Sequence, residues 1–148
     1  MKKKKDLFEY MYILVIYIFI MFIIFICFVR AEEVKIIKCI DGDSLKVLTD
    51  NLTTKTIRVL EVDTFESRKN KQAKKQARLF NLDIEIVVEI GQQAKQFCIE
   101  DWENKQVIID CWKKDRYKRD LCYVYDMKKN KYSDYMIKKK VGYYVKEY

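Results

Sequence analysis

Residues 34–62 read VKIIKCIDGDSLKVLTDNLTTKTIRVLEV, and they carry the strongest indication of the fold. It contains three runs rich in β-branched residues, separated by two polar turns, Asp-Gly-Asp at 41–43 and Thr-Asp-Asn at 49–51. The runs are 34–40, 44–48 and 54–62. Short runs of this kind, joined by turns, are typical of a meander in a small sheet or barrel. We therefore expect three consecutive strands here.

Further along the chain, helical patterns and two more strands follow. The spacing of apolar residues predicts helices over 71–81 and 92–105, and strands over 107–112 and 121–125. Residues 82–90 fit either a strand or a short helix. Ser133 is a plausible N-cap of a last short helix, and Gly142 its C′ residue. The order predicts a mainly β (α+β) fold, a five-stranded OB-type barrel with a helix between strands 3 and 4 and a short C-terminal helix.

The first 31 residues have a different composition. Residues 11–29 carry no charge, Lys2–Lys5 precede them and Arg30 follows. A run of this length can span a bilayer, and Val29-Arg30-Ala31 also fits a cleavage site after a basic start. A buried core helix is disfavoured because the run is apolar all round. We expect residues 1–31 to be a signal peptide or an N-terminal membrane anchor, which contacts the membrane through 11–29 if it is uncleaved.

Either reading places residues 32–148 outside the cytoplasm, as one secreted or membrane-anchored domain. The chain has 30 Lys+Arg against 22 Asp+Glu. This excess suits a polyanionic partner, although a lysine-rich soluble surface explains it as well. Histidine is absent. Its absence excludes Ser-His-Asp and Cys-His catalysis and histidine-containing zinc sites, so a hydrolase here must use carboxylates, Arg, Lys, Tyr or Cys.

Four cysteines follow residue 31, namely Cys39, Cys98, Cys111 and Cys122, and none forms a C-x-x-C pair. A zinc ribbon is therefore disfavoured. Outside the cytoplasm they can form disulfides in three pairings, or they can be small core residues. Symmetric pairing of strands 107–112 and 121–125 would put Cys111 opposite Cys122, within disulfide reach. A slip of one residue would put the two on opposite faces.

Three polar clusters interrupt the apolar strands. They are Asp41-Gly42-Asp43-Ser44, then Arg58 with Asp63-Thr64-Phe65-Glu66, then Asp115-Arg116-Tyr117-Lys118-Arg119. Taken singly, each is more often a turn, a surface ion pair or a helix start. Together they form a set suited to phosphoryl transfer, because carboxylates can hold a hard cation or activate water and arginines can clamp phosphate oxygens.

These motifs resemble those of the staphylococcal nuclease (thermonuclease) family. Residues 40–45 (IDGDSL) and 57–66 (IRVLEVDTFE) are similar to the family's I-D-G-D-T and R-L-x-x-V-D-T-P-E, and 115–121 (DRYKRDL) to its D-x-Y-G-R-x-L. The resemblance covers about residues 34–148. It implies a five-stranded OB barrel, and a monomeric endonuclease that hydrolyses DNA and/or RNA with Ca²⁺.

The resemblance also assigns roles by position. The metal ligands would be the carboxylates of Asp43 and Asp63 and the backbone carbonyl of Thr64, with Asp41 supporting them. Arg58 and Arg119 would bind the scissile phosphate, Glu66 would be the candidate general base, and Tyr117 would lie near the bound nucleotide.

The chain departs from the family pattern in several places. Phe65 replaces a proline, which we expect to loosen the loop that holds Glu66. Lys118 and Asp120 replace glycines beside Arg119, and either is strained if its φ is positive; Asp120 could also partly neutralise Arg119. An added basic segment spans 69–78. Its cations are expected to bind substrate phosphates, or else form a solvated face; they are Lys69, Lys71, Lys74, Lys75 and Arg78.

Three functions remain open. The first is an exported calcium-dependent nuclease. The second is a catalytically weak OB module that binds nucleic acid, tethered to the membrane. The third is a tethered interaction protein whose basic segment touches anionic lipid or cell-wall polymer. The presence of all five residues Asp43, Arg58, Asp63, Glu66 and Arg119 favours the nuclease.

Overall fold

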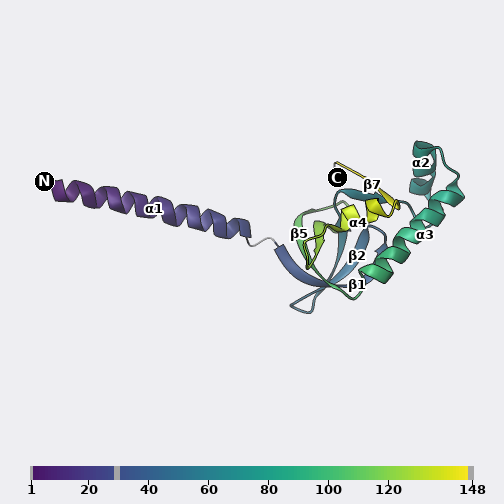
Figure 1. Ribbon diagram of the computed structural model, residues 1–148, viewed down its shortest axis with the longest axis horizontal. Coiled ribbons are helices and arrows are strands. Elements are labelled where there is room, and N and C mark those ends of the chain that lie inside the picture. The colour runs from purple at the N-terminus through teal and green to yellow at the C-terminus, as the bar shows by residue number, and fades with distance from the viewer. Residues whose placement is uncertain (1, 29–30, 147–148) are drawn as a thin grey trace. The chain divides into compact units, whose positions relative to one another are not determined.

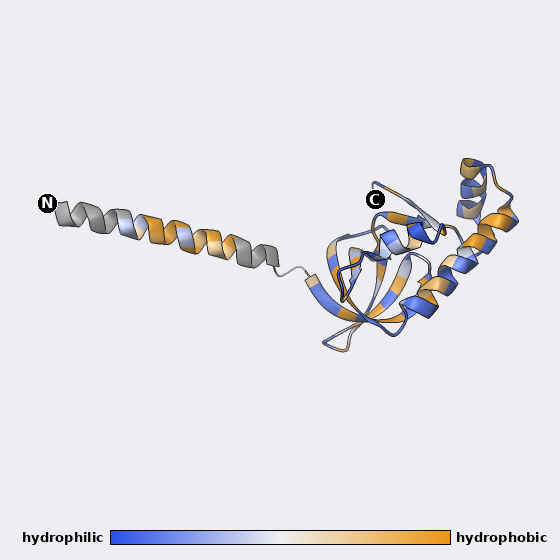
Figure 2. Cartoon of the chain, viewed as in Figure 1, coloured by the Kyte–Doolittle hydropathy of each residue, from blue (hydrophilic) through white to orange (hydrophobic). Residues whose placement is uncertain are grey.

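The computed structural model describes residues 2–28 and 31–146, and the chain divides into two units at residue 31 (Figure 1). The first unit contains α1 (Lys2–Phe28). The residues of α1 that Figure 2 colours are mostly hydrophobic. Among the residues that the structure describes, no helix combines the length and the apolarity needed to cross a membrane. Val29 and Arg30, which belong to the expected cleavage site, lie outside the described residues.

The second unit is built on a closed five-stranded barrel, which confirms the expected α+β OB-type fold. Its strands are β1 (Ala31–Asp41), β2 (Ser44–Thr49), β3 (Thr54–Val59), β5 (Gln106–Lys114) and β6 (Asp120–Asp126). They close in the order β1-β2-β3-β6-β5. The pairs β1–β2, β2–β3 and β5–β6 are antiparallel, and β3–β6 is parallel.

The third strand was expected over 54–62, and this end point is wrong, because the chain leaves the barrel after Val59. Glu61 has a φ of 65°, a left-handed conformation that interrupts the strand. The chain then forms β4 (Val62–Thr64), which pairs antiparallel with β7 (Gly142–Tyr144) in a separate two-stranded sheet. This bend carries Asp63 and Thr64 out of the barrel wall.

Two helices, not one, connect β4 to β5. They are α2 (Lys71–Phe80) and α3 (Ile84–Asp101), so the ambiguous segment 82–90 is largely helical. The buried residues of α3 explain this, because Val87, Gly91, Ala94 and Cys98 recur at spacings of three and four and form one helix face. Tertiary burial of that face decided between helix and strand.

The last helix, α4 (Tyr132–Lys138), differs from expectation at both ends. Its N-cap is Lys131 and not Ser133, which lies inside the helix and is buried. After the helix, Lys140 takes the left-handed conformation (φ 61°) that was expected of Gly142. Gly142 instead begins β7, where a Cβ would lie 2.9 Å from the Val62 side chain and 3.1 Å from the Asp63 carbonyl oxygen. Close approach to β4 therefore explains this glycine.

Two disulfides join the barrel to itself and to α3. Cys111 and Cys122 are directly opposed in the β5–β6 register and are bonded, with their Cα atoms 4.0 Å apart, which confirms the expected pairing. Cys39 of β1 is bonded to Cys98 of α3, with their Cα atoms 6.0 Å apart. This second disulfide fixes α3 against the barrel core, where Ala94 and Cys98 are fully buried.

Candidate active site

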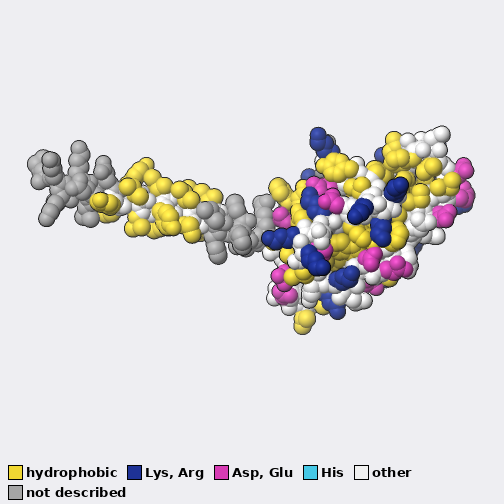
Figure 3. All heavy atoms as spheres, in the orientation of Figure 1, with side chains coloured by type: hydrophobic (Ala, Val, Ile, Leu, Met, Phe, Trp, Pro, Cys, Tyr) yellow, Lys and Arg dark blue, Asp and Glu magenta, His cyan; other side chains and the backbone are white. Residues whose placement is uncertain are grey.

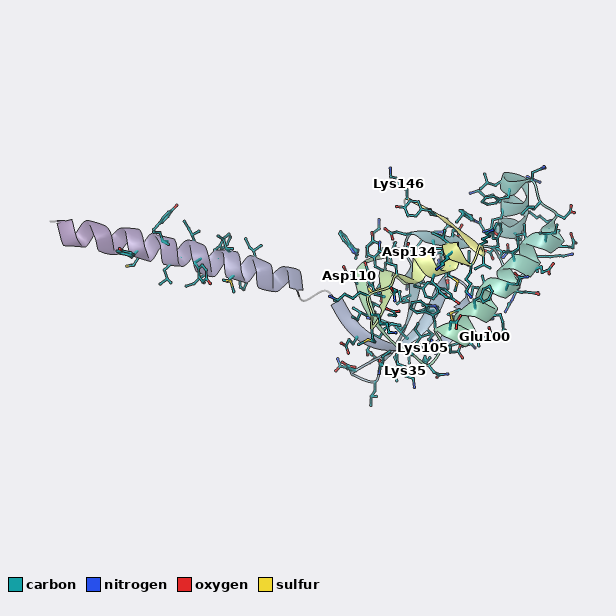
Figure 4. All side chains as sticks on the ribbon, viewed as in Figure 1. Lys35, Glu100, Lys105, Asp110, Asp134 and Lys146 are labelled. Carbon is teal, nitrogen blue, oxygen red and sulfur yellow. A yellow bond between two sulfur atoms is a disulfide. The ribbon has the colours of Figure 1, made fainter. Side chains whose placement is uncertain are left out.

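The three polar clusters lie around one cavity of about 1350 Å³. They reach it from the β1–β2 turn, from the β3–β4 bend and from the β5–β6 loop. Val145, near the C-terminus, also lines the cavity. Its neighbour Lys146 marks this end of the domain in Figure 4, opposite the end where Lys35 and Lys105 lie. Segments far apart in the sequence thus form a single site.

Arg58 is at the centre of the cluster and is almost completely buried. Its Nη1 contacts Asp43 Oδ1, and its Nη2 donates to Asp63 Oδ1 at 2.7 Å. The same Nη2 is 3.4 Å from the Val62 carbonyl oxygen. One guanidinium therefore joins the carboxylate of the β1–β2 turn to the carboxylate of β4. A charged group this deeply buried needs such partners, which fixes its orientation.

Asp43 is held by several donors and is only 7 % exposed. Its Oδ2 accepts hydrogen bonds from the Thr64 backbone N–H and from Thr64 Oγ1, both at 2.9 Å. Its Oδ1 accepts from Ser44 Oγ at 3.2 Å as well as contacting Arg58. A carboxylate offers about four lone-pair sites, so the donors around Asp43 use them all. The β1–β2 turn and β4 are thereby tied together.

Asp63 accepts fewer hydrogen bonds than Asp43. Its Oδ1 accepts from Arg58, and its Oδ2 accepts from the hydroxyl of Tyr143 at 2.6 Å. The antiparallel β4–β7 register places these two residues opposite each other. Burial, and then the hydrogen bond to Asp63, raise the pKa of Tyr143 to about 12. No signal in the sequence indicated Tyr143, because a helix ending just before Gly142 was expected here and no strand after it.

Arg119 is paired with Asp115 and reaches the β1–β2 turn. Its Nε and Nη2 both lie 2.8 Å from Asp115 Oδ2, and its Nη1 donates to Ser44 Oγ at 2.8 Å. Burial alone would raise the pKa of Asp115, but donors from Arg119 and Tyr117 outweigh it and hold that pKa below its usual value. Asp120 does not neutralise Arg119, because it pairs with Lys114 at 2.6 Å.

The loop around Arg119 presents an aromatic ring to the cavity. Tyr117 is 64 % exposed, and the guanidinium carbons of Arg116 and Arg119 lie 4.8 and 5.4 Å from its ring centroid. Lys118 has a φ of 65°, so the strain expected at one of the two replaced glycines is present. Asp120 is an ordinary β-strand residue without it. An exposed ring beside two arginines suits a nucleobase stacked above a phosphate.

Glu66 lies beside the cavity, and its backbone is held from two helices. Its N–H donates to Gln76 Oε1 of α2 at 2.9 Å, and its side-chain Oε2 accepts from Asn70 Nδ2 at 2.6 Å. A Cβ on Gly91 of α3 would be 2.3 Å from the Glu66 carbonyl group, so this close approach requires glycine. Asp41, near by, accepts from Ser67 Oγ at 2.7 Å and also lines the cavity.

Phe65 does not leave this segment loose, contrary to expectation. It is 8 % exposed, and its ring packs against those of Phe80 and Tyr143, with centroids 5.2 and 5.8 Å away. The aromatic cluster replaces the rigidity that a proline would have supplied. The partner rings come from α2 and β7, so no local pattern around Phe65 could have indicated them.

The basic segment 69–78 is mostly directed away from the site. Of its five cations, Lys75 is the one that lines the cavity within the described part of the chain. Lys69 forms an ion pair with Glu85 at 2.5 Å, while Lys71, Lys74 and Arg78 are exposed on α2. The other cavity-lining cations besides the two arginines are Lys55, Lys113, Lys114, Arg116 and Lys118. Lys and Arg are scattered among acidic side chains over the face shown in Figure 3.

The oxygen atoms of the site are of the type that binds a hard cation such as Ca²⁺. In the described part of the chain, no group of three or more Asp, Glu, Cys or His side chains could hold a metal ion. The candidate oxygens are two carboxylates and the Thr64 carbonyl, and oxygen donors are what Ca²⁺ takes. Asp63 and Thr64 keep lone pairs beyond their hydrogen bonds, whereas Asp43 would have to release Arg58 or Ser44.

A family model described as staphylococcal nuclease homologue matches residues 56–147. The matched segment contains Arg58, Asp63, Glu66 and Arg119, while the β1–β2 turn precedes it. No curated protein matches the chain.

Proposed function

This chain belongs to the staphylococcal nuclease family, and on that premise we propose that it is a calcium-dependent endonuclease that hydrolyses phosphodiester bonds of DNA or RNA. The observation that carries the proposal is the convergence of two arginines, two aspartates and Glu66 on one cavity. This combination of bidentate phosphate donors and carboxylates supplies what hydrolysis needs without histidine.

The arginines would bind and stabilise the scissile phosphate. Arg119 Nη1 donates to a neutral serine hydroxyl, an interaction that a phosphate oxygen can replace at little cost. Asp115 holds the other side of the same guanidinium and keeps its fork directed at the cavity. Arg58, fixed between Asp43 and Asp63, would add positive charge from the β3 side. Donors fixed before reaction can stabilise the charge that grows on the phosphoryl oxygens.

Glu66 would accept the proton from the attacking water. Its carboxylate is partly exposed to the cavity, so water can reach it. Asn70 donates to Oε2 and leaves Oε1 for the water. When calcium is bound, Asp43, Asp63 and the Thr64 carbonyl would hold it, and the ion would supply positive charge beside the phosphate. Tyr117 would stack on a neighbouring base, and Lys75 would contact a flanking phosphate.

A plasmid-nicking assay with the full-length chain tests this proposal. Activity is expected with Ca²⁺ and is expected to vanish in excess chelator. Glu66→Gln and Arg119→Ala should each lower the rate roughly 10²–10⁴-fold, by comparison with lost general bases and oxyanion donors. Arg68→Ala, at an exposed position that does not line the cavity, is the matched control. Activity that persists in chelator would contradict calcium dependence.

The same assay separates the nuclease from a module that binds without cutting. A gel-shift measurement with oligonucleotides should show binding in either case. Binding with no product after long incubation in Ca²⁺ would favour the module. The presence of Arg58, Glu66 and Arg119 together in one cavity supports the nuclease, because a non-cutting module has no need of all three.

We further propose that residues 1–31 direct export as a signal peptide or anchor, and that the domain acts as a monomer outside the cytoplasm. The two disulfides support an oxidising location, since such bonds are rare in the cytosol. Cell fractionation followed by N-terminal sequencing tests this. A cytoplasmic product that keeps all four cysteines reduced would contradict export.

A further inference from the structure

Gln76 of α2 is a buried polar residue, whereas the charged residues of this helix are exposed. It is 1 % exposed, between the buried residues Ala73 and Ala77. Its amide oxygen accepts from the Glu66 N–H at 2.9 Å. Its amide nitrogen donates to the Thr64 carbonyl at 3.0 Å and lies 3.4 Å from the Tyr143 hydroxyl. One side chain thus contacts three residues of the site.

The three residues that Gln76 contacts all belong to the proposed catalytic site or support it. Thr64 would contribute its carbonyl to calcium, Glu66 would be the base, and Tyr143 donates to the third group, Asp63. Gln76 itself does not line the cavity. It therefore lies behind the site, where it can fix the positions of groups that touch substrate or metal without touching either.

The hydrogen bonds of Gln76 hold residues 64–66 on the α2 side. A buried amide is costly unless its donors and acceptors are satisfied, so its hydrogen bonds have little freedom to move. Gly91 of α3 lies against the backbone of the same residue, since a Cβ there would be 2.3 Å from the Glu66 carbonyl. Residues 64–66 are thereby confined between α2 and α3, although α2 contributes no base, metal ligand or arginine to the proposed reaction.

We propose that Gln76 is a positioning residue for the active site, and that α2 holds it in place. The inference rests on the proposed function and names a further part of its machinery. Gln76 aligns the Thr64 carbonyl and the Glu66 backbone through one planar amide. A side chain that only filled space between α2 and β4 would be apolar, as Ala73 and Ala77 are.

The test compares Gln76→Met with Gln96→Met in the full-length chain. Methionine keeps nearly the volume of glutamine and removes the three hydrogen bonds of the amide, to Glu66, Thr64 and Tyr143. Gln96 lies exposed on α3, where its side chain donates to Glu100 at 2.6 Å, so the same substitution there controls for the loss of an amide on a helix. Three quantities are measured for each folded variant: calcium affinity by calorimetric titration, kcat, and KM for a defined oligonucleotide.

Gln76→Met is expected to lower kcat and calcium affinity by about 10–100-fold each, the effect of losing a partner that orients a metal ligand. KM should stay within about twofold, because Gln76 touches no substrate. Amide hydrogen exchange should accelerate at Glu66 and remain slow in β2. Gln96→Met should match the wild type in every measurement.

Two results would overturn the inference while leaving the proposed function intact. One is a folded Gln76→Met variant with wild-type kcat and calcium affinity. The other is a rise in KM alone. A wild-type chain that neither binds calcium nor cuts would instead overturn the proposed function. If Gln76→Met does not fold, Gln76→Asn replaces it, because its amide is one methylene too short to reach Thr64 and Glu66 together.

Discussion

The hydroxyl of Tyr143 orients the carboxylate of Asp63. The hydroxyl donates to Asp63 Oδ2, while the ring packs on Phe65 and Phe80. The aromatic cluster therefore orients a carboxylate that is a candidate metal ligand. Burial and this hydrogen bond both favour the neutral phenol, and they raise its pKa to about 12.

The raised pKa of Tyr143 predicts a pH dependence of stability. An unfolded tyrosine titrates near pKa 10, so between about pH 10 and 12 the folded chain retains a proton that the unfolded chain loses. The stabilisation is therefore fully present below about pH 10 and is lost as the pH rises to 12. Urea unfolding of the wild type and Tyr143→Phe should show a difference that shrinks across this window. Tyr144→Phe, at an exposed neighbour, is the control; parallel curves for Tyr143→Phe would contradict the assignment.

At the level of elements, the β5–β6 loop keeps a conformation that its sequence does not favour. Lys118 is in the left-handed region, where a side chain costs about 1–2 kcal/mol. Its N–H donates to the Asp115 carbonyl at 3.0 Å, and the Asp115 side chain accepts from the backbone of Tyr117 and Arg119. These bonds impose the turn, and so they aim Arg119 at the cavity.

Lys118→Gly should therefore stabilise the chain by about 0.5–1 kcal/mol, because glycine removes the left-handed cost but makes the unfolded state more flexible. Equilibrium unfolding in urea measures the change. Lys128→Gly, in the β6–α4 turn but without a positive φ, is the matched control and should destabilise. A loss of stability in Lys118→Gly would show that the side chain itself holds the loop.

The lysines of α2 differ in where they lie relative to the cavity. Lys75 lines the cavity, whereas Lys71 and Lys74 are exposed outside it. Lys75→Gln should flatten the slope of log binding constant against log salt by about 0.7–0.9, the value for one lost phosphate contact, measured in chelator so that no cleavage occurs. The double variant Lys71→Gln/Lys74→Gln should keep the wild-type slope. Equal flattening by both would mean that the whole exposed face of α2 binds substrate.

For the whole domain, the two disulfides close loops of different size. Cys39–Cys98 has a sequence separation of 59 and Cys111–Cys122 one of 11. In the chain-entropy model the longer closure is worth about 1.5 kcal/mol more, roughly 4.3 against 2.8 kcal/mol. The first also joins β1 to α3, and α3 carries the Gly91 contact with Glu66. It thus links the core to the site.

The double variant Cys39→Ala/Cys98→Ala should consequently lose more unfolding free energy than Cys111→Ala/Cys122→Ala, by about 1.5 kcal/mol. Urea denaturation of both, beside the wild type with and without reductant, measures this. Equal losses, or a larger loss for the shorter loop, would show that packing around the sulfurs outweighs chain entropy.

Local pattern was sufficient to predict the barrel strands and the motif residues around the cavity. Alternating β-branched residues and polar turns are short-range signals, and the register that opposes Cys111 to Cys122 follows from a hairpin. The two arginines and the acidic clusters were predicted from their combination and from the resemblance to the staphylococcal nuclease family, because each of them is common by itself. Each of those features is formed by residues close together in the sequence, so it can be recognised without knowing the fold.

The remaining features could not be predicted from local patterns, because they depend on contacts between segments far apart in the sequence. Burial of one face made 84–90 helical, and pairing with Tyr143 made 62–64 a separate strand. Gln76 looked like one polar residue of a basic helix until the fold brought it to Thr64 and Glu66. The lysines of that helix looked equivalent until packing turned Lys75 toward the cavity and paired Lys69 with Glu85. Which side chain faces the site is set by how the helix packs, and no local sequence pattern carries that information.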